Sequence, residues 1–302
     1  MSTEPASTSR SHRNATLIGL VAVLLWSASV GLIRSVSELL GPTGGAAMLF
    51  TTAGCLATLV LGLPRPGAFN RTYLWLGGTL FVVYEVCLAL SLGWASNHAQ
   101  VLELGMINYL WPCLTILLAV LCGQQRASPL LWPGVLLSFA GIVWVMKGDG
   151  PLSPAAFLRN VQDNPVAYAL AGCAAVLWPA YSVLTRRFAG GKSAIPLFLL
   201  ATALALWVKY ALGPEPALQF STRGVAQVLV GGGFMAAAYS CWNHGIQRGH
   251  LTLLAVASYF TPILSVLLAS LWLGIRPTAG FWQGVVMVTG GSLLCWRSTR
   301  AR

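Results

Sequence analysis

The sequence predicts an all-α polytopic membrane protein with ten transmembrane helices, arranged as two inverted five-helix repeats around a central cavity. Three observations predict this fold: an apolar composition, a series of apolar runs, and an internal repeat. Hydrophobic residues make up 56% of the 302 residues and charged residues only 8%, against roughly 25% charged residues in soluble domains. Lipid, not water, is therefore the expected solvent for most of the chain.

Each apolar run is long enough for a helix that crosses a bilayer, which takes about 20 residues. The first run resembles a secretory signal, but nine more such runs argue against cleavage. The predicted spans are residues 14–35, 44–63, 72–94, 98–121, 128–147, 165–186, 194–212, 222–245, 250–273 and 278–297.

The second half of the chain repeats the first. A shift of 150 positions aligns residues 109–141 with residues 259–291, and twelve of the aligned positions are identical, among them Tyr109 with Tyr259. Such self-similarity is the signature of a duplicated unit. Because each unit would cross the membrane five times, an odd number, the second copy is expected to be inverted relative to the first.

The boundary between the repeats is expected in a polar stretch that contains Pro and Gly. We predict a first repeat at 1–147 with a polar tail at 1–13, a linker at 148–164, and a second repeat at 165–302. Cytoplasmic loops are enriched in Lys and Arg. With both termini in the cytoplasm, twelve of the 18 Lys and Arg residues lie inside and six outside, which makes the linker external.

The net charge of +11 does not indicate a nucleic-acid partner, because the basic residues flank the spans and form no basic cluster with interleaved polar residues. The seven cysteines show no CxxC or Cys/His spacing, so no metal site or disulfide framework is predicted. We expect no cofactor, and a monomer in the lipid bilayer whose partner is a small molecule.

Two carboxylates lie inside predicted spans, Glu85 in the third and Glu103 in the fourth. A charge inside a membrane is costly and usually faces a cavity or a partner. Each residue has two interpretations, a carboxylate that exchanges protons or binds a substrate amine, and a structural residue hydrogen-bonded to His98, Gln100 or the backbone. We expect Glu85 to matter more, because it lies deeper than Glu103.

Two prolines, Pro112 and Pro262, occupy matched positions inside predicted spans. Proline removes a backbone hydrogen bond and kinks a helix. Symmetric kinks near the bilayer centre suit gating hinges, although proline also occurs in membrane helices for packing alone.

Deep aromatic and amide residues are the candidate substrate site. A buried tyrosine hydroxyl or indole N–H needs a polar partner, and Trp26 aligns with Trp178 at a shift of 152. Core packing is the competing interpretation for any one of them. With Glu85, the predicted substrate-binding residues are Trp26, Tyr84, Asn108, Tyr109, Trp178, Tyr181, Trp242, Asn243 and Tyr259.

Several strings of the sequence resemble a known family. The duplication resembles the drug/metabolite transporter superfamily with its EamA-type repeats, and residues 87–93, 100–116, 258–262 and 281–284 are similar to the aromatic amino acid exporters of the YddG type found in bacterial inner membranes. The resemblance implies helices around a cavity that opens to either side in turn and exports aromatic and other neutral amino acids. The first span holds no acidic residue, unlike small multidrug members of the superfamily.

The sequence thus predicts an exporter of amino acids in the bacterial inner membrane. A broader metabolite or cationic-drug exporter, for which methyl viologen is a substrate implied by the resemblance, is the alternative within transport. A membrane-embedded enzyme would need a convergent acid/base or metal constellation, and the four histidines lie in different parts of the chain. A purely structural membrane subunit is the remaining alternative.

Overall fold

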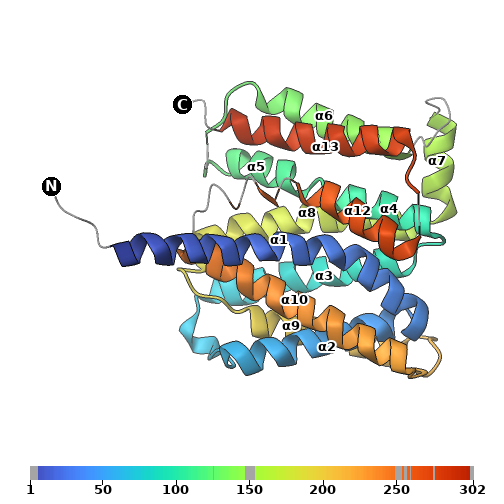
Figure 1. Ribbon diagram of the computed structural model, residues 1–302, viewed down its shortest axis with the longest axis horizontal. Coiled ribbons are helices and arrows are strands. Elements are labelled where there is room, and N and C mark those ends of the chain that lie inside the picture. The colour runs from blue at the N-terminus through green and yellow to red at the C-terminus, as the bar shows by residue number, and fades with distance from the viewer. Residues whose placement is uncertain are drawn as a thin grey trace.

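The protein is a bundle of α-helices. The computed structural model describes residues 6–124, 126–146, 154–248, 254, 257–258, 260–274 and 276–299, and within these ranges it contains helices and their connections but no strand. Most of the helices lie side by side in the view of Figure 1, whereas α7 stands across one end of α6 and α13.

The described residues of the first half of the chain form six α-helices. They are α1 (Ala6–Leu40), α2 (Pro42–Leu61), α3 (Gly78–Gly93), α4 (His98–Asn108), α5 (Trp111–Leu121) and α6 (Leu131–Met146). A short 3₁₀ turn (Pro66–Ala68) follows α2, and a π-helical turn (Tyr73–Gly77) leads directly into α3. The second half holds α7 (Pro154–Asp163), α8 (Pro165–Phe188), α9 (Ile195–Leu212), α10 (Thr222–Arg248), α12 (Thr261–Leu273) and α13 (Ala279–Ser298).

The prediction of a multi-pass membrane protein is confirmed. In the described residues, seven helical stretches are long and apolar enough to cross a membrane, and two shorter apolar helices cover Leu131–Val145 and Thr261–Leu273. Large apolar side chains are exposed along these helices, for example Leu59 at 81% and Leu271 at 80% exposure. Such surfaces are stable against lipid tails and would be a liability in water.

The linker differs from the loop expected between the repeats. Its residues from Pro154 to Asp163 form helix α7, while residues 147–153 lie outside the described part of the chain. Asn164 then starts α8, because its side-chain oxygen accepts a hydrogen bond from the backbone N–H of Ala167 at 3.3 Å. A proline at the first position of a helix costs no hydrogen bond, which explains why both α7 and α8 begin at one.

The predicted kink at Pro112 is instead a break between two helices. Helix α4 ends at Asn108, and the N–H of Leu110 turns back to the carbonyl of Ile107 at 3.1 Å before α5 begins. Pro112 is the second residue of α5, a position where its missing N–H leaves no intrahelical bond unmade. The prediction of a proline inside one continuous helix was therefore wrong.

The same turn recurs 150 residues later. The N–H of Phe260 bonds to the carbonyl of Ala257 at 3.1 Å, α12 begins at Thr261, and Pro262 is its second residue. The sequence repeat thus reproduces its backbone geometry at the equivalent positions. Tyr259 lies outside the described residues.

The helices pack in pairs that join the two halves of the chain. Helix α6 packs along α13 and α2 along α9, while α1 packs along α10 and α3 along α8. Figure 1 shows α6 and α13 together at one edge of the bundle and α2 at the opposite edge. The hydrophobic core lies between these pairs.

A seam of glycines joins α6 to α13. A Cβ atom at Gly291 would lie 2.5 Å from the carbonyl oxygen of Gly134, and one at Gly284 would lie 2.7 Å from that of Gly141. These pairings require the two helices to run antiparallel. Only residues without a Cβ let the backbones approach this closely, as in other membrane helix pairs.

We expect Gly291→Ala to destabilise the protein, because the new methyl group would force α6 and α13 apart. Overpacking of this kind costs about 1–3 kcal/mol. The matched control is Gly290→Ala, since a Cβ there would meet only Leu137, at 3.9 Å. Both changes share the gain in helix propensity. Thermal unfolding of the purified variants measures the difference, and equal melting temperatures would show that the seam tolerates a side chain.

Candidate functional site

A cavity lies where several helices meet the two interrupted segments. Its volume is about 50 Å³, which is room for a few water molecules and much less than an aromatic amino acid occupies. The lining residues are Trp26, Ser29, Val30, Ile33, Tyr84, Glu85, Leu88, Asn108, Tyr109, Trp111, Trp178, Met235, Tyr239 and Thr261.

The two interrupted segments supply four of the lining residues. Asn108 ends α4, Tyr109 lies in the break, and Trp111 begins α5. Thr261, which begins α12, is the equivalent of Trp111 in the second half. The two helix breaks therefore place side chains at the cavity that a continuous helix would point elsewhere.

Trp178 of α8 is the centre of the aromatic wall. Its ring centroid lies 4.8 Å from that of Tyr84, 6.1 Å from Trp26 and 6.4 Å from Trp111. The rings are tilted or edge-to-face, which are the arrangements that aromatic pairs prefer. Side chains of α1, α3, α5 and α8 thus form one continuous aromatic surface.

Glu85 is a buried carboxylate at the cavity. Its side chain is 2% exposed, and it accepts a hydrogen bond from the hydroxyl of Tyr239 on α10. The hydroxyl compensates part of the cost of removing a carboxylate from water. Of the lining residues in the described part of the chain, Glu85 alone has a carboxyl group.

Glu103 lies outside the cavity lining and accepts a hydrogen bond from the hydroxyl of Tyr168 on α8. The expected neighbours, His98 and Gln100, instead contact Glu38 and Ser96. Sequence spacing within one segment could not reveal Tyr168, because it comes from the other half of the chain. The contact ties α4 to α8.

The structure brings together six of the ten predicted substrate-binding residues at the cavity: Trp26, Tyr84, Glu85, Asn108, Tyr109 and Trp178. Tyr181 lies behind them, with its ring 5.3 Å from Trp178 and 5.4 Å from Phe81. Trp242 packs against Trp26 at 5.0 Å. Tyr259 and the side chain of Asn243 lie outside the described residues.

The predicted set of substrate-binding residues left out Tyr239, although its depth in an apolar span was a signal for it, and sequence reasoning missed Thr261. Tyr239 lies three residues before Trp242 on α10, a spacing that places both on one helix face, and this spacing was a second signal. Thr261 follows the break at Phe260 and aligns with Trp111. A threonine in an apolar span has many structural uses, so its type alone gave no signal.

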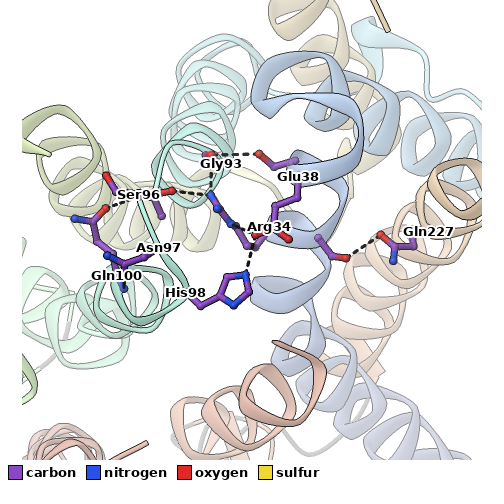
Figure 2. Close-up of polar contacts among 11 residues, drawn as sticks. Arg34, Glu38, Gly93, Ser96, Asn97, His98, Gln100 and Gln227 are labelled. Atoms are coloured by element: carbon purple, nitrogen blue, oxygen red, sulfur yellow. Dashed lines mark hydrogen bonds and ion pairs between the residues drawn. The ribbon is translucent and has the colours of Figure 1, made fainter. Parts of the chain in front are cut away.

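Polar contacts close one end of the bundle beyond the cavity (Figure 2). Arg34 at the end of α1 pairs with Glu38 at 2.8 Å, and His98 contacts the same carboxylate oxygen at 2.8 Å. The guanidinium also donates to the carbonyls of Gly93 and Ala95, at 3.1 and 2.7 Å. Arg34 thereby fixes α1 to the turn between α3 and α4.

The same turn is tied to the second half of the chain. The side-chain amide of Asn164 donates to the carbonyl of Trp94 at 2.7 Å and to Gln100 Oε1 at 3.0 Å. Gln100 also accepts from the N–H of Ser96 at 2.7 Å, as Figure 2 shows. These bonds satisfy backbone groups that the turn leaves without helical partners.

No metal site is apparent in the described ranges, where no three His, Cys, Asp or Glu side chains come together. The site is instead an apolar, aromatic cavity with a few convergent polar groups. This is the usual make-up of a pocket for a small molecule.

Comparison with known proteins identifies the family. The model of the EamA-like transporter family matches residues 165–297. A Salmonella typhimurium protein named "Aromatic amino acid exporter YddG" is 48% identical, over 96% of this chain and 99% of that protein. The chain belongs to the EamA-like transporter family.

Other similar proteins have the same name. Proteins of the same name from Escherichia coli and Ancylobacter novellus are 47% and 30% identical, over 96% and 93% of this chain and 99% and 96% of theirs. A solved crystal structure of a protein with 26% sequence identity superposes with a TM-score of 0.69, covering 96% of this chain and 100% of that one. This EamA-type protein is therefore a transporter and not an enzyme.

Proposed function

We propose that this EamA-type transporter exports aromatic and other neutral amino acids across the bacterial inner membrane through the central cavity. Its relatives are named aromatic amino acid exporters. The observation that carries the proposal is the aromatic wall around Trp178, which lines a cavity at the middle of the helical segments. Offset or edge-on ring contacts contribute about 0.5–1.5 kcal/mol beyond the burial of apolar area.

Transport would proceed by alternating access. The cavity volume of about 50 Å³ is too small for a tryptophan side chain, so the helices around it must separate before a substrate enters. We propose that Trp26, Tyr84, Tyr109 and Trp178 contact the substrate directly. Tyr181 and Trp242, together with Asn243 and Tyr259, would complete or support the site.

An inverted repeat of five plus five helices is the architecture that supports this motion. Helices α6 and α13 correspond to the fifth and tenth predicted spans, and the glycine pairs Gly134–Gly291 and Gly141–Gly284 exchange under the 150-residue shift. Two equivalent helices that contact each other antiparallel are what a twofold axis in the membrane plane produces. In the repeat, α1 corresponds to α8 and α3 to α10. The pairing of α1 with α10 is therefore equivalent to the pairing of α3 with α8.

We propose that both termini are cytoplasmic and that α7 is external. The Lys and Arg distribution supports this orientation. The end of the bundle that Arg34 closes would then face the periplasm, and the end where Lys192 donates to the carbonyl of Ala68, at 2.7 Å, would face the cytoplasm.

Pro112 and Pro262 would act at the hinges. Each is the second residue of a helix that follows a break beside the cavity. A break leaves few hydrogen bonds to be exchanged when α5 or α12 changes its angle to the preceding segment. Proline would keep the break in place, because a continuous helix cannot form through it.

A broader exporter of organic cations is the second candidate. The buried carboxylate of Glu85 beside a wall of tryptophan and tyrosine rings favours it, since aromatic faces attract cations. Competition between methyl viologen and tryptophan for transport would support this wider specificity.

Counterflow of labelled amino acids into proteoliposomes tests the proposed function. We expect exchange of tryptophan and phenylalanine by the purified protein, and Trp178→Ala should slow this exchange several-fold more than exchange of threonine. Trp75→Ala is the matched control, because Trp75 is 73% exposed and away from the cavity. Failure of the native protein to exchange any amino acid would overturn the proposal, and an equal loss for all three substrates would indicate packing damage.

The orientation is tested by labelling intact cells with a membrane-impermeant maleimide in a cysteine-free background. Gln162→Cys on α7 should react in intact cells, whereas Gly67→Cys, between α2 and α3, should react only after the membrane is opened. Both positions are exposed. The opposite pattern would reverse the proposed topology.

The hinges are tested by Pro112→Ala and Pro262→Ala. Alanine would favour a continuous helix through each break, so exchange of phenylalanine should slow several-fold while its binding weakens less. Pro196→Ala is the matched control, since Pro196 is the second residue of α9 and no cavity residue. Native exchange rates in both variants would show that these prolines are not hinges.

A further inference from the structure

Three polar atoms at the cavity are buried and have no hydrogen-bond partner. They are the indole nitrogen of Trp26, the side-chain carbonyl oxygen of Asn108 and the hydroxyl of Thr261. A polar atom left unpaired in an apolar interior lowers stability. Three such atoms around one cavity indicate a site that a polar ligand satisfies.

The three atoms differ in what they can bind. The Trp26 N–H is only a donor, Asn108 Oδ1 is only an acceptor, and the Thr261 hydroxyl is both. They come from α1, from the end of α4 and from the start of α12. A ligand that pairs with all three must therefore offer both hydrogen-bond donors and acceptors.

Two of the lining residues favour a negative group. Trp111 and Thr261 both line the cavity, and they are the first residues of α5 and α12, which are 11 and 13 residues long. The N-terminal end of a helix carries a partial positive charge and attracts anions. At the start of α12 this charge coincides with the unpaired Thr261 hydroxyl, which is 3% exposed.

Other lining residues favour a positive group. Glu85 is the acidic residue of the lining, and one of its carboxyl oxygens accepts a hydrogen bond from Tyr239. Asn108 Oδ1 is a second acceptor in the lining. A buried carboxylate and a second acceptor suit an ammonium group, which has three N–H donors and no acceptor.

We propose that the cavity binds the dipolar head group of a free α-amino acid, with its ammonium at Glu85 and Asn108 and its carboxylate at Thr261, the start of α12 and the Trp26 N–H. The inference deepens the proposed function and rests on it for the identity of the substrate class. The aromatic ring then lies toward Trp178, which borders the same cavity.

The site should reject molecules that carry only one of the two charges. Phenylpropionate would bring a second negative charge near Glu85 without an ammonium to neutralise it. Phenethylamine would keep the contact with Glu85 but leave Thr261 and Trp26 unpaired. A site built to pair polar groups discriminates strongly against ligands that lack them.

Equilibrium binding of labelled phenylalanine to the purified full chain tests the proposal, with phenylalanine, phenethylamine and 3-phenylpropionate as competitors. The native protein should bind each single-charge analogue at least about tenfold more weakly than phenylalanine. Comparable binding of the three ligands, or no binding of phenylalanine, would overturn the proposal.

Variants assign the two ends of the head group. Glu85→Gln should weaken phenylalanine binding about tenfold or more and should strengthen phenylpropionate binding, because the negative charge that repels its carboxylate is removed. Thr261→Val and, independently, Trp26→Phe should weaken phenylalanine several-fold and leave phenethylamine unchanged. Uniform weakening of all three ligands by each of these variants would contradict the assignment.

Two matched controls separate the site from general damage. Glu103→Gln removes a carboxylate that lies outside the cavity lining, and Thr289→Val removes a buried, unpartnered hydroxyl from α13. Both should keep the native ligand profile. Counterflow keeps the two proposals distinct: exchange without discrimination between the analogues overturns the head-group site alone, and discrimination without exchange overturns export alone.

Discussion

Two helix breaks in the middle of apolar segments set the conditions for the rest of this structure. In hydrocarbon, a backbone or side-chain polar group without a partner is costly, so irregular backbone persists only where protein covers it or where it lines a cavity. The breaks before α5 and α12 both lie at the cavity, and both are made by the same turn. Trp111, beside the first break, packs against Trp178, and Thr261, beside the second, lines the cavity.

Helices that lie away from the two breaks pack against each other much more closely. Helices α6 and α13 meet through glycines, and neither helix lines the cavity. Close backbone contact resists bending, whereas a helix break permits it. We propose that the glycine seam keeps the two halves of the chain together while the segments around α5 and α12 change their angles.

The sequence predicted the elements well because each depends on local information. Run length places the helices, and the repeat aligns Trp26 with Trp178 and Pro112 with Pro262. Buried charge in an apolar run identified Glu85. The sequence could not predict features that depend on contacts between distant segments, such as Tyr239 with Glu85 or Tyr168 with Glu103. The helix break at Tyr109 was predicted as a kink, because proline in an apolar run is compatible with both.

A structure of the full chain with bound L-tryptophan tests the central claim most directly. The account predicts the indole ring against Trp178, the amino nitrogen within hydrogen-bond distance of Glu85, and the carboxylate at Thr261 and the start of α12. Tryptophan bound in the reverse direction, with its carboxylate next to Glu85, or bound outside this cavity, would contradict it.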